Sequence, residues 1–185
     1  MTRSYVPLVA LLVIGCCLIC AAHATQVMYQ SPQQMGTESA LVVRGKVQST
    51  QSYWNASHTK IFTRTQIAVD ETYKGPHQGV IDIVQIGGTV DKVKVTVQGA
   101  LQWKAGEEVL LFVEPYDASS FQVSGFSQGK FAVERDPKTG VAYVTAPSLD
   151  GTAVIGAPSA DAMAKPGKSE KVTLEQFVNR ALGRR

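Results

Sequence analysis

Few residues of this 185-residue chain have the chemistry of a catalytic or metal site. His58 and His77 are the only histidines after position 24, and each stands among Asn, Ser, Gly or Pro, a composition typical of turns. Their separation gives neither an HxH nor an HxxxH pair, and both are expected in exposed loops. The sequence therefore predicts no metal site and no cofactor.

The acidic side chains do not predict an acid–base pair either. Adjacent carboxylates occur at Asp70-Glu71 and at Glu107-Glu108. Because neighbouring side chains of a strand point to opposite faces, neither pair is expected to face one substrate. Solvated strand ends explain both pairs.

Serine and glycine motifs give no nucleophile and no phosphate loop. Ser124 and Ser127 lack the strand–elbow–helix pattern that exposes a catalytic serine. No helix follows Gly87-Gly88, so this pair is expected at a strand corner rather than around a phosphate. The sequence therefore predicts a non-enzymatic protein, and the alternative is a hydrolase whose residues converge only in three dimensions.

Basic side chains are candidates for binding. Arg44 and Lys46 share the outer face of an alternating strand. We expect them opposite Arg64 and Gln66 of the next strand, where they form a modest basic patch. The alternative is an ordinary solvated face.

Aromatic side chains are the second set of candidates for binding. Tyr53 and Trp54 are expected at the tip of a hairpin, and Trp103 near a second corner. There they can stack on a sugar or hold a peptide. The alternative for Trp103 is that it packs under the sheet.

Long alternating strands are expected to position these side chains. Residues 41–53 alternate with period two, and their apolar face includes Leu41 and Val43. Residues 61–73 are rich in β-branched side chains. Their core face is expected to contain Ile61, Ile67, Val69 and Tyr73. Shorter strands are expected at 80–86, 92–97, 109–113, 121–126, 130–133 and 141–144.

Two helices and a linker are expected outside the strands. Ser31 is an N-cap before Pro32, and Thr173 opens a capping box before an apolar stripe. The segment between the last strand and this stripe is rich in Ala, Gly, Ser, Pro and Lys, which is typical of a flexible linker. The expected division of the chain is a signal peptide 1–24, a short N-terminal segment 25–38, a β-barrel domain 39–147, a flexible linker 148–171 and a C-terminal helix 172–183.

Strands that bend at a glycine serve both halves of a small closed barrel, and Gly45 stands at the expected bend. A β-sandwich is the alternative. Three runs, residues 39–47, 65–76 and 103–112, follow in order, with a polar turn and a hydrophobic third strand between them. In this order they resemble the netrin-like module, the OB-type barrel of the tissue inhibitors of metalloproteinases, and also a type of small secreted bacterial protein.

The resemblance implies a mainly β fold class: a small OB-like closed or partly open antiparallel barrel with an added β-hairpin and a C-terminal helix. Inhibitors of that family bind the protease zinc through an N-terminal cysteine and carry disulfides. Here all three cysteines precede the expected N-terminus Thr25. The fold is therefore expected to carry over without that zinc-binding mechanism.

The first 24 residues have the pattern of a secretory signal. Arg3 precedes an apolar run, and Ala22-His23-Ala24 supplies the small residues that signal peptidase requires, with cleavage after Ala24. The alternatives are a lipidated Cys16 and an uncleaved anchor, the only two membrane attachments expected. The expected location is secreted or periplasmic.

Composition limits the class of partner. Without Arg3, 17 basic residues face 15 acidic ones, too small an excess for the dense basic face of a nucleic-acid binder. No nucleic acid is expected. The predicted function is an exported non-enzymatic binding module that recognises a protein or an extracellular polymer. The alternatives are a protease inhibitor or protease-associated protein on the OB-like fold, and the hydrolase described above.

Intact-mass spectrometry of the exported protein distinguishes the three N-termini. We expect a mass that begins at Thr25, because small residues occupy positions 22 and 24. A mass that begins at a lipidated Cys16, or one that includes residue 1, contradicts cleavage after Ala24.

Overall fold

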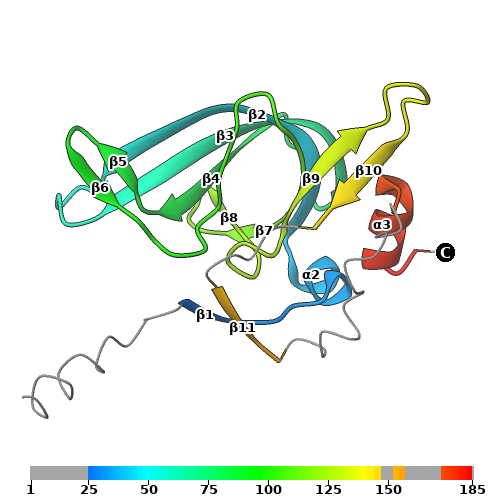
Figure 1. Ribbon diagram of the computed structural model, residues 1–185, viewed down its shortest axis with the longest axis horizontal. Helices are drawn as coiled ribbons and strands as arrows, with labels where there is room; N and C mark the ends of the chain where they lie inside the picture. The colour runs from blue at the N-terminus through cyan, green and yellow to red at the C-terminus, as the bar shows by residue number, and fades with distance from the viewer. Residues whose placement is uncertain (1–24, 147–151, 157–171, 185) are drawn as a thin grey trace, which may run out of the picture.

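The computed structural model describes residues 25–146, 152–156 and 172–184 (Figure 1). The expected signal peptide and most of the expected linker lie outside these ranges. One part of the expected linker is a strand, β11 (Thr152–Ile155), which pairs in parallel with β1 (Thr25–Met28).

Five strands close into a ring, which confirms the small barrel (Figure 1). β2, β3 and β4 are consecutive antiparallel neighbours, β7 returns beside β2, and β8 pairs with β7. This Greek-key order is that of an OB-type barrel. The ring closes through one parallel pair between β4 and β8. The five strands are β2 (Leu41–Trp54), β3 (Ile61–Lys74), β4 (Val80–Ile86), β7 (Glu108–Pro115) and β8 (Phe121–Val123).

The ring encloses an inner core that follows the predicted alternation. On β2, Leu41, Val43 and Val47 are buried, whereas Lys46 between them is exposed. Aliphatic side chains from all five strands meet there, and burying each one stabilises the fold by about 1.5–3 kcal/mol. The inner core contains Leu41, Val43, Val47, Ile67, Ile81, Ile83, Leu101, Val109, Leu111, Val113 and Val123.

A second, outer core lies on the other face of β2 and β7. The hairpin β9–β10 extends the sheet from β7, and the helices α2 and α3 cover it (Figure 1). Phe131 of β9 packs against Phe177 of α3 with ring centroids 4.7 Å apart. The expected C-terminal helix therefore docks on the barrel. These elements are α2 (Pro32–Glu38), β9 (Lys130–Arg135), β10 (Ala142–Thr145) and α3 (Leu174–Ala181).

Side-chain caps begin both helices at the predicted residues, and of the box predicted at Thr173 the described contacts include only the bond to the Gln176 amide. Ser31 and Gln34 form a reciprocal capping box at α2, and Thr173 accepts a hydrogen bond from the Gln176 amide at α3. The predicted corner at Gly87-Gly88 leads into a small hairpin of β5 (Gly88–Val90) and β6 (Val93–Val95).

β2 and β3 approach each other closely at Gly45, where the sequence places a bend. A Cβ atom at this position would clash with the Ala68 carbonyl oxygen. Next to this contact the register between the strands shifts, so that Arg44 pairs with Glu71 and Gly45 with Val69, leaving Asp70 as an extra residue. This is a β-bulge, which increases the bend and twist that barrel closure needs.

The bulge overturns one expectation from the sequence. Tyr73 was expected on the same face as Ile67 and Val69, but it packs against the outer core whereas they lie in or against the inner one. An extra residue at Asp70 shifts the alternation by one position, so the odd-numbered face changes sides beyond it.

Replacing Leu174 tests the docking of α3. Leu174 is 7 % exposed in the outer core, and we expect Leu174→Ala to lower the free energy of unfolding by about 2–3 kcal/mol. Gln176→Ala, on the exposed face of the same helix, is the control, with a change below about 0.5 kcal/mol. Urea denaturation measures the free energy of unfolding of both variants. An equal loss in Leu174→Ala and Gln176→Ala contradicts a docked helix.

Candidate functional site

Aromatic side chains gather at the end of the barrel formed by the β2–β3 turn and the loop after β7. Tyr53 of β2 and Phe62 of β3 are directly paired across the strands, with ring centroids 6.2 Å apart. Tyr116 lies 6.3 Å from Phe62 on the other side. Trp54 and His58 add a stacked pair with centroids 5.9 Å apart. No ring contact joins this pair to the other three among the described residues, since Trp54 follows Tyr53 on β2 and neighbouring strand side chains point to opposite faces. We call these five side chains, which share one end of the barrel, the aromatic surface.

The turn between β2 and β3 is fixed by Asn55. Its Oδ1 accepts hydrogen bonds from the amides of Thr59 and Lys60, at 2.8 and 2.9 Å. The turn holds His58 at a positive φ of 53°, against the ring of Trp54. The aromatic surface is therefore partly preformed, with little side-chain freedom left in the turn.

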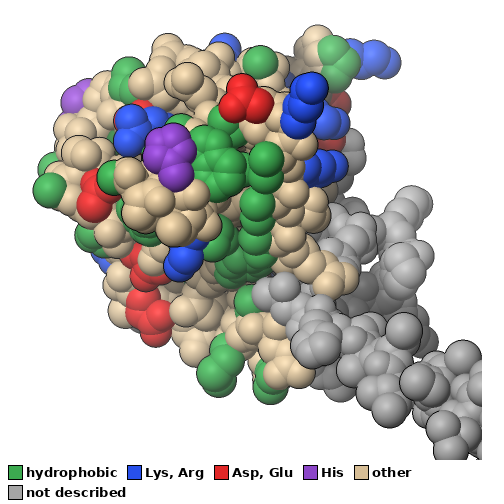
Figure 2. All heavy atoms as spheres, turned by 90° about the vertical axis from the view of Figure 1, so that its left-hand side faces the viewer, with side chains coloured by type: hydrophobic (Ala, Val, Ile, Leu, Met, Phe, Trp, Pro, Cys, Tyr) green, Lys and Arg blue, Asp and Glu red, His purple; other side chains and the backbone are tan. Residues whose placement is uncertain are grey.

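Figure 2 shows the molecule from the side of this turn. Hydrophobic side chains there form a contiguous group with a histidine and are flanked by basic and acidic side chains. Tyr116 and Ile86 are 44 % and 38 % exposed. In this part of the chain, large apolar side chains are in contact with water.

Beside the aromatic surface, a groove of about 360 Å³ opens between β4 and β8. We call it the seam groove. Its walls are mainly apolar, and its size is within the range of small binding pockets. Its lining residues are Phe62, Val84, Gln85, Ile86, Ala100, Leu101, Glu114, Tyr116, Gln122, Val123 and Phe126.

Trp103 lies against the inner core. Its indole N–H donates to Gln85 Oε1 at 3.0 Å, and the Lys130 ammonium stands 4.9 Å from its ring centroid. The structure therefore places Trp103 in a packing role under the strands.

The expected basic patch is wrong in its register. Arg44 pairs with Glu71 and Lys46 with Ala68, whereas Arg64 pairs with Gln51. The turn and the register shifts between β2 and β3 set this pairing, so that Arg64 lies near the turn at the start of β3, away from Arg44. There Arg64 lies over the ring of Tyr53 at 5.4 Å and so adjoins the aromatic surface.

Arg44 instead forms the centre of an ionic network. Its guanidinium contacts Asp70 at 3.2 Å, Glu71 at 3.4 Å and Glu108 at 2.7 Å. Arg135 of β9 holds the same Glu108 through two hydrogen bonds. Carboxylates offset the charge of both arginines, so these side chains tie strands together rather than present free positive charge.

The two adjacent acidic pairs behave differently. Asp70 and Glu71 both face Arg44, contrary to the expectation that neighbours diverge, because the bulge turns two successive side chains to one side. At the start of β7 there is no bulge, and the two carboxylates diverge as alternation predicts: Glu107 pairs with Lys130 and Glu108 with Arg44.

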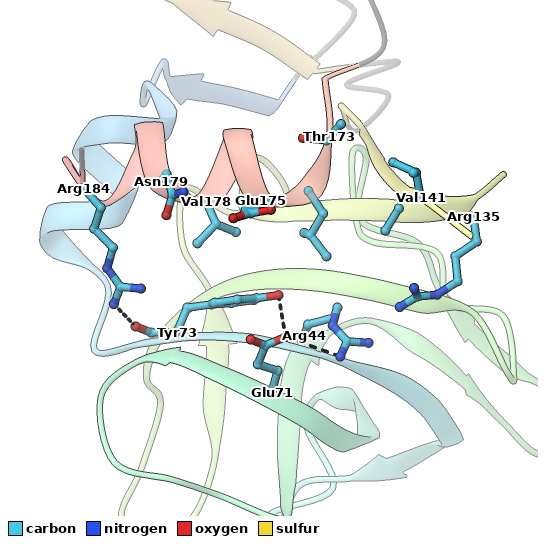
Figure 3. A pocket seen from close by; sticks show the side chains of 12 residues that line it. Arg44, Glu71, Tyr73, Arg135, Val141, Thr173, Glu175, Val178, Asn179 and Arg184 are labelled. Atoms are coloured by element: carbon cyan, nitrogen blue, oxygen red, sulfur yellow. Dashed lines mark hydrogen bonds and ion pairs between the residues drawn. The ribbon is translucent and has the colours of Figure 1, made fainter. Parts of the chain in front are cut away.

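The network forms one wall of a cleft of about 640 Å³ between the barrel and α3 (Figure 3). Tyr73 and Glu71 of β3 face Arg44, and Arg184 donates to the Tyr73 carbonyl oxygen. Burial, followed by the hydrogen bond to Glu71, raises the pKa of Tyr73 to about 12. Tyr73 therefore stays protonated and is a hydrogen-bond donor here, not a base.

Phe62 and Tyr116 were absent from the sequence-based candidates. Phe62 had a signal, because placing the turn at 55–60 puts it opposite Tyr53. Tyr116 had none, since its loop approaches β3 only through closure of the ring.

Among the described residues, no cluster of three or more His, Cys, Asp or Glu could hold a metal ion. His77 is exposed in the turn after β3. No helix in the described ranges is long and apolar enough to cross a membrane. No protein-family model matches the chain, and no curated protein matches it.

The pH dependence of stability tests the ionic network. Burial opposes ionisation of Glu108, but hydrogen bonds from Arg135 and Arg44 outweigh it and lower its pKa below 4.5. Its stabilisation is therefore present above the unfolded pKa and is lost as the pH falls through the lower folded value. We expect Glu108→Gln to lower the free energy of unfolding by about 1–3 kcal/mol at neutral pH. Below about pH 5, the free energy of unfolding of this variant should fall less steeply with pH than that of the wild type.

Urea denaturation over a pH series measures this effect. Glu134→Gln, at an exposed position of the neighbouring β9, is the matched control and should keep the wild-type profile. If the free energy of unfolding falls equally steeply in acid for Glu108→Gln and the wild type, Arg44 and Arg135 do not stabilise the ionised carboxylate.

Proposed function

We propose that the protein is an exported, non-enzymatic binding module that recognises a protein or an extracellular polymer through its aromatic surface. The observation that carries this proposal is the row of Tyr53, Phe62 and Tyr116 rings beside an open apolar groove. Aromatic side chains bury large areas with few rotatable bonds, and they dominate the energetics of many interfaces.

The position of the surface supports the same function. OB-type barrels bind their ligands on the second and third strands and on the loops after the first and fourth. Here these are β3, β4, the turn at 55–60 and the loop after β7. His58, Phe62 and Tyr116 of the aromatic surface lie on these elements, and β4 forms one wall of the seam groove. The location outside the cytoplasm is part of the proposal and depends on the signal-like residues 1–24.

The histidines support a binding role over catalysis. His58 stacks on Trp54 in the aromatic surface, and His77 is in an exposed turn. Neither has a carboxylate hydrogen-bond partner among the contacts of the described residues, an arrangement that a His-based general base normally uses for orientation.

Substitutions on the aromatic surface test the proposal. The chain from Thr25 is immobilised and exposed to secreted proteins and to purified extracellular polysaccharides. We expect Trp54→Ala and Tyr116→Ala each to weaken the observed binding at least about tenfold, because the half-buried Trp54 and the exposed Tyr116 present aromatic rings that can act as anchors. Tyr29→Ala, an aromatic change next to β1, is the control with unchanged binding.

Two outcomes would contradict the proposal: no binding to either panel, or equal binding by all three variants. A parallel assay against a panel of extracellular proteases tests the inhibitor alternative. Inhibition lost in Tyr116→Ala would assign that function to the same surface.

A further inference from the structure

We infer that the seam groove accepts an extended segment of a partner polypeptide, which adds as a strand to the free edge of β4. This inference depends on the proposed function, since it names the partner class for that end of the barrel. Strand addition uses main-chain hydrogen bonds for affinity and side-chain pockets for specificity.

The ring is weakest between β4 and β8. β3 and β4 are paired through seven residues, whereas β4 and β8 share only the pair Ile83 and Phe121. Beyond this pair, Val84 to Ile86 have no strand opposite them on that side among the described residues. The barrel is therefore joined here by one residue pair, and the seam groove, which Ala100 and Leu101 also line, lies along the rest of this edge.

The hydrogen-bond phase shows which groups face the opening. The Gly87 amide donates to the Ile61 carbonyl and the Val69 amide to the Gly79 carbonyl. In an antiparallel pair such bonds recur at every second residue, so odd-numbered positions of β4 bond to β3. The N–H and C=O of Ile86 therefore point away from β3, into the seam.

The shape of the groove agrees with a free edge. Val84, Gln85 and Ile86 all line it, although neighbours on a strand point to opposite faces of the sheet. A cavity that touches three successive residues of a strand reaches either both of its faces or its backbone edge. An added strand in this position can hydrogen-bond to Ile86 and insert side chains on both faces.

The lining defines the chemistry of the added segment. Phe62, Tyr116 and Phe126 offer an apolar wall for every second side chain. Glu114 is the only charged side chain that lines the groove among the described residues, and Gln122 donates to it at 3.0 Å. The complementary partner is an extended peptide with apolar residues at alternate positions and one Lys or Arg.

A saccharide fits the observations less well. It can stack on the rings of Tyr53 or Tyr116, but it has no polypeptide backbone whose N–H and C=O groups can pair with those of Ile86 in a strand ladder. Removal of the Ile86 N–H therefore separates the two classes of ligand.

A displayed library of random 12-residue peptides, selected on the chain from Thr25, supplies the probe. We expect selected peptides to alternate apolar residues and to carry a basic one. Ile86→Pro removes the edge-facing N–H without breaking the β3–β4 ladder, and proline is tolerated at sheet edges. Ile86→Pro should lower the affinity for a selected peptide at least about tenfold more than Ile86→Ala, which shortens the side chain but keeps the N–H.

Matched controls keep the test independent of folding. Val80→Pro removes an equivalent edge-facing N–H at the other end of β4 and should change the affinity less than about twofold. Amide exchange in the wild type is a second measurement, in which peptide binding should slow exchange at Ile86. Glu114→Gln should weaken only peptides that carry Lys or Arg.

Three outcomes overturn the inference: no selected peptides, equal affinity of Ile86→Pro and Ile86→Ala, or unchanged exchange at Ile86. The proposed function is tested separately. If Trp54→Ala and Tyr116→Ala lose binding to a polysaccharide while Ile86→Pro retains it, the proposed binding function is supported and the inference of an added strand is contradicted.

Discussion

The close approach of β2 and β3 at Gly45 is the constraint on which the rest of the structure depends. β2 is paired on both edges, with β3 and β7, so it cannot bend away from either neighbour. The Ala68 carbonyl occupies the place where any Cβ at position 45 would lie. This contact allows the strong bend of a five-stranded ring, and the bulge at Asp70 beside it accommodates the bend in the ladder.

The bulge has effects on both faces of the sheet. It turns Asp70 and Glu71 together toward Arg44, which joins β2, β3 and β7, while Arg135 attaches β9 to the same centre through Glu108. It also moves Tyr73 to the outer core, under α3. One inserted residue thus connects the inner barrel with the layer of hairpin and helices that covers it.

Most of the fold was predictable because it depends on local patterns. Alternation gave the long strands, and the Ser31 and Thr173 caps gave the helix starts. The register of Arg44 was not predictable, because bulges leave no period in the sequence. The aromatic surface was predicted only in part. Tyr53 and Trp54 directly precede a recognisable turn, whereas Tyr116 joins this end only after ring closure, 54 residues beyond its contact Phe62 in the chain.

The pairing of Leu41 with Val113 limits how the chain can fold. The ring cannot close until the segment around residue 113 reaches the first long strand, so the decisive contacts are remote in sequence. Such topologies fold slowly, on the scale of milliseconds to seconds. Until that contact forms, the apolar side chains that β2 and β7 bury in the inner core remain exposed to water.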